Sequence, residues 1–198
     1  MITFVIPTIG RDSLAQTVES LIKQTDPDWK AVVVFDGVEP SLDIVDSRIA
    51  VAKIDKTGWL EEDLNGRGGY VRNAGIKLAG TEWVGFVDDD DALDPSYTRA
   101  LKETLIATPD AEVVIFRMKF WDDKIKPKLG ATTFELEGVG ISFCVRRRLF
   151  AEENFWFVQS HIEDFLLLDM LRRAGKRIVM SSAVTYLIRP HWAGGGNS

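Results

Sequence analysis

Apolar residues in the first half of the chain fall into short runs that are separated by amphipathic stretches. Four runs have the length and β-branched content of buried strands, at residues 3–6, 31–35, 49–54 and 83–87. Between them, apolar residues at helical spacing predict helices that begin near Ser13 and Tyr70. Strands that alternate with helices predict an α/β fold whose central sheet is mostly parallel and flanked by helices.

Local signals give expected ends for several elements. Pro7 is expected to stop the first strand. Ser13 with Gln16 forms a capping-box pattern at the start of a helix. Asp94 and Pro95 suit the N-cap and the first position of a helix that runs to about residue 107.

The second half is less regular. Further strands are expected at residues 111–116, 178–180 and 184–188, and an apolar helix at 163–174. Residues 121–145 show weaker patterning, and we expect a small antiparallel ribbon there. The glycine-rich residues 193–198 are expected to form a flexible tail. The whole chain, 1–198, is therefore predicted to be one domain.

Composition and charge exclude several classes of protein. A chain of 198 residues with 45 % hydrophobic residues can bury a core as one compact domain. Its net charge of −6 is opposite in sign to what general nucleic-acid binding requires, so no nucleic-acid partner is expected. No run approaches the roughly 20 apolar residues of a transmembrane helix. With no basic leader and the single Cys144, we expect a cytoplasmic protein.

Polar residues follow three of the expected strands. Pro7 and Thr8 follow the first, Asp36 follows the second, and residues 88–91, all aspartates, follow the strand at 83–87. Ligands of open parallel sheets bind beyond the carboxyl ends of the strands. These clusters therefore predict a site at one edge of the sheet.

The four aspartates carry the strongest chemical argument. Two carboxylates about 4 Å apart repel each other by about 4 kcal/mol at an effective dielectric constant near 20. A block of four beside a buried strand therefore favours a bound cation, and oxygen ligands suit Mg²⁺ or Mn²⁺ bridging to a phosphate. The alternative is an exposed acidic turn.

Other polar residues fit an anion site and acid–base chemistry. Arg72 and Asn73 lie early in a helix after a glycine-rich approach, where anions are favoured. Arg72 could instead pair with a surface carboxylate. Glu163 and Asp164 open the apolar helix, either as partners of its dipole or as a general base. His191 follows the last strand, either as a solvated histidine or as a metal ligand.

Taken in order, these segments resemble the family 2 glycosyltransferases of the GT-A superfamily. Residues 4–8 are similar to the opening strand of that family, and residues 33–37 to its second strand. Residues 72–75 match its Arg-Asn-x-Gly helix start, and residues 86–91 its metal-binding Asp-x-Asp motif. Residues 163–164 resemble its Glu-Asp pair. The second strand departs from the family pattern, because it ends in Phe-Asp-Gly rather than in paired aspartates.

The resemblance implies a GT-A fold, a Rossmann-like sheet whose residues 1–92 mainly bind nucleotide and whose residues 93–192 mainly bind acceptor and carry catalysis. Mn²⁺ or Mg²⁺ is expected on Asp90 and His191, although an offset of one to Asp89 or Asp91 stays open. Asp164 is expected to be the base, with Glu163 beside it. The residues expected to bind the nucleotide-sugar are Pro7, Thr8, Asp36, Arg72, Asn73, Asp88, Asp89 and Arg189.

The implied reaction is metal-dependent transfer of a sugar, with inversion, from a nucleoside-diphosphate sugar. A UDP-sugar is the favoured donor, and a glycan or another hydroxyl compound the acceptor. One alternative is a sugar nucleotidyltransferase, which needs a glycine-rich, arginine-containing loop where this chain has only residues 7–11. A second alternative is a nucleotide- or carbohydrate-binding module without catalysis.

Overall fold

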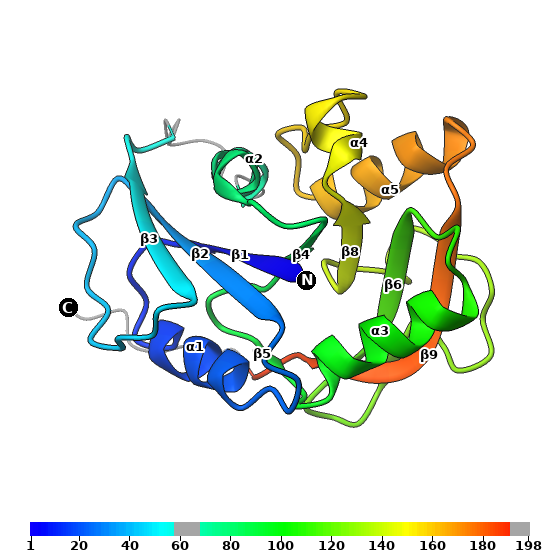
Figure 1. Ribbon diagram of the computed structural model, residues 1–198, viewed down its shortest axis with the longest axis horizontal. Coiled ribbons are helices and arrows are strands. Elements are labelled where there is room, and N and C mark those ends of the chain that lie inside the picture. Colours follow the sequence, from blue (N-terminus) through cyan, green and yellow to red (C-terminus); the bar gives the residue numbers. More distant parts are fainter. Residues whose placement is uncertain (58–67, 191–198) are drawn as a thin grey trace.

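The computed structural model describes residues 1–57 and 68–190, which form a mixed sheet with helices on both faces (Figure 1). The strand order is β3-β2-β1-β4-β8-β6-β9-β5, with β7 paired to β6. The strands are β1 (Ile2–Thr8), β2 (Trp29–Asp36), β3 (Ile49–Ile54), β4 (Trp83–Phe86), β5 (Ala92–Leu93), β6 (Val113–Lys119), β7 (Ile125–Lys126), β8 (Phe143–Arg146) and β9 (Ile178–Leu187). The helices are α1 (Leu14–Ile22), α2 (Gly68–Leu78), α3 (Tyr97–Ala107), α4 (Arg148–Ala151) and α5 (Glu163–Arg173).

The first four strands form the parallel half of the sheet, which confirms the predicted α/β class. β1 pairs in parallel with β2 and β4, and β2 pairs in parallel with β3. Nearly all of β1 and β2 is buried, as expected for strands covered on both faces. In Figure 1, α1 and α3 lie on one side of the sheet, and α2, α4 and α5 lie on the other.

β8 joins this half to the second half of the sheet. It pairs antiparallel with β4 on one side and with β6 on the other, and β6 continues in parallel with β9. Phe116 of β6 and Ser142, just before β8, are linked by two hydrogen bonds of 2.8 Å, one from the Phe116 N–H and one from the Ser142 hydroxyl. Antiparallel pairs in this half include the short β6–β7 ribbon, of which β7 lies within the region 121–145 where a ribbon was expected and the paired residues of β6 lie just before it.

Two expected boundaries differ from the structure. The two strands expected at the end of the chain are one continuous strand, β9. β1 continues through Pro7, because β4 pairs with β1 only as far as Val5. The Val5 carbonyl accepts the Val87 N–H on that side. Two residues on, Pro7 faces the same side, where no strand needs its missing N–H.

The predicted caps of two helices also differ from the structure. Ser13 is the N-cap residue of α1, as predicted, but its side chain makes no capping hydrogen bond. Asp94 does not cap α3, which begins at Tyr97 after Ser96. Asp94 instead accepts hydrogen bonds from the Ser96 N–H (2.9 Å) and hydroxyl (2.5 Å), which builds a turn before the helix.

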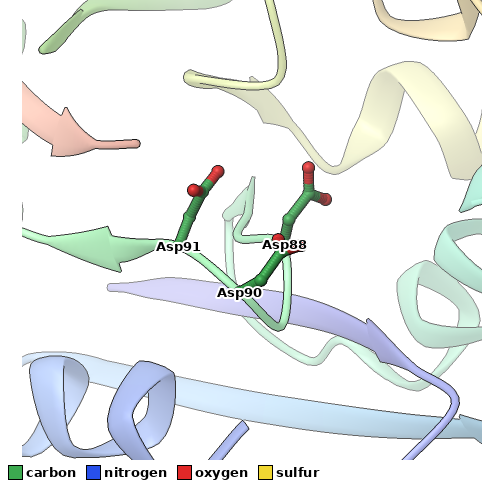
Figure 2. Close-up of side chains that lie close together, drawn as sticks. All are labelled: Asp88, Asp90 and Asp91. Carbon is green, nitrogen blue, oxygen red and sulfur yellow. The ribbon is translucent and has the colours of Figure 1, made fainter. Parts of the chain in front are cut away.

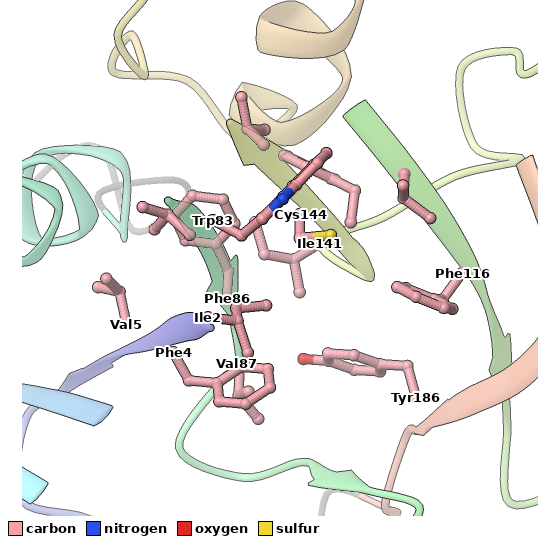
Figure 3. Close-up of a cluster of buried hydrophobic side chains, with 14 of the residues drawn as sticks. Ile2, Phe4, Val5, Trp83, Phe86, Val87, Phe116, Ile141, Cys144 and Tyr186 are labelled. Atoms are coloured by element: carbon pink, nitrogen blue, oxygen red, sulfur yellow. The ribbon is translucent and has the colours of Figure 1, made fainter. Parts of the chain in front are cut away.

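Aromatic side chains fill the core where the two halves of the sheet meet (Figure 3). The Phe86 ring contacts Phe143, Phe150 and Phe157 edge-on, at centroid distances of 5.5, 6.4 and 4.9 Å. Figure 3 shows Tyr186 beside Phe116, with its hydroxyl directed towards the strands of the first half. One apolar cluster therefore supports both sides of the site described below.

Gly75 lets α2 pack closely on the parallel strands. A Cβ at this position would lie 2.4 Å from Val5 Cγ1 and 3.1 Å from Val34 Cγ2. Those distances are too short for any side chain, so the glycine sets how near α2 can approach β1 and β2. The final glycine of the Arg-Asn-x-Gly motif is thus explained by packing.

We expect Gly75→Val to lower the free energy of unfolding by about 1–3 kcal/mol, because the added carbons must displace two buried valines. Urea unfolding measures the change. Gly80→Val is the matched control, since a Cβ there meets nothing within 4 Å. Equal effects of the two substitutions would contradict the packing argument.

Candidate active site

The loop between β4 and β5 carries the four aspartates and directs them to two sides. Asp88, Asp90 and Asp91 each offer a carboxylate oxygen within 4.8 Å of the others. Figure 2 shows the Asp88 and Asp91 carboxylates pointing to the same side of the loop. Asp89 makes separate contacts with β1 and the residues after it. We refer to Asp88, Asp90 and Asp91 as the aspartate trio.

Asp89 is an internal tether of this loop. Its carboxylate accepts hydrogen bonds from the Thr8 hydroxyl (2.6 Å) and from the Arg11 guanidinium (2.9 Å). Burial raises the pKa of Asp89, and the contacts with Thr8 and Arg11 offset this only in part. The structure thus brings Thr8 and Asp89 together, as the strand-end argument predicted, and joins them directly to each other.

Asp91 lies in an environment with excess negative charge. It is 4 % exposed, and burial together with the charge of Asp88 raises its pKa to about 7. The Arg189 N–H donates to Asp91 at 3.1 Å, and the Tyr186 hydroxyl accepts the Asp88 N–H at 3.1 Å. The alternative of an exposed acidic turn is therefore wrong, since Asp89 and Asp91 are both buried.

The trio has the chemistry of a site for a hard divalent cation. Three carboxylate oxygens at this spacing suit Mg²⁺ or Mn²⁺, which complete their coordination with water and substrate phosphate. A cation would also offset the charge that raises the pKa of Asp91. Asp90 is part of the trio, as predicted for a metal ligand. His191, the other predicted ligand, lies outside the described residues.

Arg72 connects the aspartate loop to α5. The guanidinium donates to Asp88 at 2.5 Å and to Glu163 at 2.8 Å, and the side chain is almost fully buried. Burial alone would lower the pKa of Arg72, but the charges of Asp88 and Glu163 outweigh it and raise the pKa above its usual value. The alternative of a surface ion pair is therefore wrong.

Two other predicted nucleotide-sugar residues make extensive contacts within the protein. The Asn73 amide bonds the backbone of Phe157 in both directions, at 2.8 and 3.1 Å. The Arg189 guanidinium donates to the backbone carbonyl oxygens of Asp90 (2.8 Å) and Asp91 (2.7 Å) and to the Thr17 hydroxyl (2.7 Å). Arg189 therefore fixes the backbone that presents the trio.

Asp36 lies at the end of β2, on the same sheet edge, and is buried. It accepts hydrogen bonds from the Thr57 N–H at 2.7 Å and from the Thr57 hydroxyl at 2.9 Å. These bonds close the connection after β3 over the end of β2. Pro7, half-buried in β1, lies opposite Val34 in the adjoining strand.

A pocket of about 360 Å³ joins the aspartates to the start of α5. Its lining includes Asp88 and Asp91 at one part and Glu163 and Asp164 at another. Asp88, Asp91 and the predicted base therefore line one cavity, whereas Asp90, the predicted metal ligand, is not among its lining residues. The full lining is Arg72, Asp88, Asp91, Met118, Phe120, Lys126, Glu137, Val139, Gly140, Ile141, His161, Glu163, Asp164 and Ile188.

Asp164 has the environment of a carboxylate that can exchange a proton. Burial raises the pKa of Asp164, and the Phe165 N–H, which donates to it at 2.7 Å, offsets this in part. A Cβ on Gly140 would lie 3.5 Å from Asp164 Oδ2 and 3.0 Å from Met118 Sδ. Gly140 thus leaves room on the pocket side of Asp164.

Sequence reasoning did not identify several residues of this site. Tyr186 is fully buried and touches the aspartate loop through its hydroxyl. Phe120, Lys126 and Glu137 line the pocket from the irregular segment of the chain. Tyr186 has the signature of a core aromatic residue, and the other three have no pattern that separates them from surface residues.

Comparison with known proteins gives the family. The sequence profile of "Glycosyl transferase family 2" matches residues 3–174. The chain belongs to glycosyl transferase family 2. This match confirms the resemblance to family 2 glycosyltransferases that the sequence motifs indicated.

Relatives agree with this assignment. Over 103 residues the chain is 32 % identical to a glucosyl-dolichyl phosphate glucuronosyltransferase of Haloferax volcanii. The aligned region covers 52 % of this chain and 32 % of the relative. The chain therefore spans about a third of the length of that protein.

The fold is that of solved GT-A glycosyltransferases. The crystal structure of S. aureus TarS 1–349 in complex with UDP-GlcNAc matches with a TM-score of 0.74 and 18 % identity, over 100 % of this chain and 62 % of TarS 1–349. A longer TarS structure matches with a TM-score of 0.73 over 96 % of this chain. Among the described residues, no helix has the length and apolar character needed to cross a membrane.

We expect Arg72→Met to lower the free energy of unfolding by about 3 kcal/mol, because two carboxylates lose their buried counter-charge. The value lies at the low end for broken buried pairs, since Asp88 is partly open to water. Urea unfolding measures the loss. The control is Arg99→Met, which removes an exposed pair with Glu103 and should cost less than about 0.5 kcal/mol. A loss as small as that of the control would contradict the role given to Arg72.

Proposed function

We propose that this domain transfers a sugar from a nucleoside-diphosphate sugar to an acceptor hydroxyl, with a divalent cation on the aspartate trio. The observation that carries the proposal is the single pocket shared by Asp88, Asp91 and Asp164. Membership of glycosyl transferase family 2 supports the reaction class. The fold shared with TarS, whose structure contains UDP-GlcNAc, supports a UDP-sugar as the donor.

The residues divide the work of a direct displacement at the anomeric carbon. Mn²⁺ or Mg²⁺, when bound, supplies positive charge that stabilises the departing nucleoside diphosphate. Asp88, Asp90 and Asp91 would hold that cation, and Arg189 and Tyr186 fix the loop that carries them. Arg72 holds Asp88 and Glu163 in place across the pocket.

Asp164 would accept the proton of the attacking hydroxyl. Its raised pKa makes the carboxylate a stronger base than an exposed aspartate. A base that faces the donor across a pocket favours attack from the side opposite the leaving group. We therefore propose inversion at the sugar.

A binding module without catalysis is the second candidate. It requires the trio for nucleotide binding and gives Asp164 no role. The burial of Asp164 against the pocket, with space left by Gly140, favours catalysis. Slow hydrolysis of the donor by the purified domain would separate the two, because a binding module leaves the donor intact.

We expect UDP with Mn²⁺ to raise the thermal midpoint of the domain by several degrees, since saturation at 100 times Kd stabilises by about 2.7 kcal/mol. A panel of UDP-, GDP- and dTDP-sugars identifies the donor. Asp90→Ala should abolish the metal-dependent shift. Asp110→Ala should keep it, because Asp110 is an exposed carboxylate outside the trio and the pocket. No shift with any nucleotide would refute the proposal.

We expect Asp164→Asn to leave the nucleotide shift intact and to lower donor turnover at least 100-fold, because the amide cannot accept the proton. Turnover of the unmodified protein should fall as the pH falls through the pKa of Asp164, with an acidic limb above the ordinary value of 3.8. Turnover is measured by release of the nucleoside diphosphate. Retention at the anomeric carbon, or full activity of Asp164→Asn, would remove Asp164 from the mechanism.

A further inference from the structure

Lys126 occupies the wall of the pocket on the side of Asp164. It lies on β7, opposite Met118 of β6, and Met118 lies opposite Tyr186 of β9. Met118 and Asp164 both approach Gly140, so Met118, Gly140 and Asp164 line the same wall of the pocket. Adjacent strands are about 4.8 Å apart, so the backbone of β7 lies about 10 Å from β9, the strand of Tyr186.

The Lys126 ammonium has capacity to bind a ligand. The ammonium donates a hydrogen bond of 2.8 Å to the Glu137 carbonyl oxygen and lies 5.7 Å from the centroid of the Phe120 ring. An ammonium has three N–H donors, so two remain for another partner. Among the described residues, no carboxylate lies within ion-pair distance of Lys126, whereas Arg72 is engaged by two.

A buried arginine fixes the segment that follows Lys126. Arg117 of β6 is 3 % exposed and has no carboxylate partner among the described residues. Its guanidinium donates to the carbonyl oxygens of Pro127 and Ala131, each at 2.9 Å, and to that of Lys128. Burying a cation that has no carboxylate partner costs free energy. The hydrogen bonds of Arg117 offset part of this cost and fix the shape of this part of the pocket wall.

The charges of the groups around the pocket indicate which kind of ligand group Lys126 binds. An acceptor hydroxyl must approach Asp164 close to Glu163, Asp88 and a donor diphosphate, all of them negative. An acceptor with its own negative charge would be repelled there unless a cation met that charge. Lys126 stands on the acceptor side of the pocket and is the cation available for it.

We propose that Lys126 binds an anionic group, a phosphate or a carboxylate, that the acceptor carries near the hydroxyl to be glycosylated. This inference rests on the proposed function, because it takes the Asp164 side as the acceptor side. If the role of Lys126 were only structural, its ammonium would serve only to donate the hydrogen bond to the Glu137 carbonyl oxygen. The two roles differ in whether the lysine distinguishes charged from neutral ligands.

The test is a calorimetric titration of the purified domain with glucose 6-phosphate, with glucuronate and with glucose. Each titration is done in the presence and in the absence of UDP and Mg²⁺. At least one anion should bind about tenfold or more tightly than glucose, as expected for a charge-assisted hydrogen bond. Lys126→Met should remove that preference, and Lys126→Arg should keep most of it. Binding of only the phosphate, or only the carboxylate, identifies which group is recognised.

Lys128→Met is the matched control, because Lys128 is exposed two residues away and does not line the pocket. It should leave anion binding unchanged. Anions that bind no better than glucose, or an anion preference that survives in Lys126→Met, would overturn the inference. A nucleotide shift without any effect of Lys126 refutes only this inference, whereas loss of the nucleotide shift in the unmodified protein refutes the proposed function.

Discussion

The ion pairs of Arg72 with Asp88 and Glu163 are the constraint on which the rest of the site depends. Asp88 belongs to the loop after β4, Glu163 begins α5, and Arg72 reaches both from α2. Three elements that are distant in sequence are thus held at fixed separation around one cavity. Because the buried guanidinium balances both carboxylates, losing it would leave two negative charges uncompensated, so the three elements hold their places together.

The sequence predicted the parallel half well for a physical reason. β1, β2 and β4 are buried on both faces, so their apolar runs are continuous, and the polar residues that follow them must lie at one edge. Thr8, Asp36 and the aspartates lie there. The role of Asp89 as a tether was not predictable, because four identical side chains in a row do not reveal which of them faces β1.

The remainder of the site depends on contacts between distant segments. Tyr186 reaches the aspartate loop because β9 pairs with β5, the strand that follows the loop, and Lys126 lines the pocket because β7 pairs with Met118 of β6. Neither position has a local periodicity that marks it. The cap expected at Asp94 was wrong for a related reason, since its side chain bonds Ser96 and builds a turn before α3.

The pairing of Phe116 with Ser142 has a consequence for how specificity can change. Residues 117–141 connect β6 to the neighbouring strand β8, and the hydrogen bonds between Phe116 and Ser142 hold the two ends of this segment side by side. This segment supplies Phe120, Lys126, Glu137 and Gly140 to the pocket. The length and residues of this segment can therefore change while β1, β2 and β4, which position the aspartate loop, keep their places in the sheet.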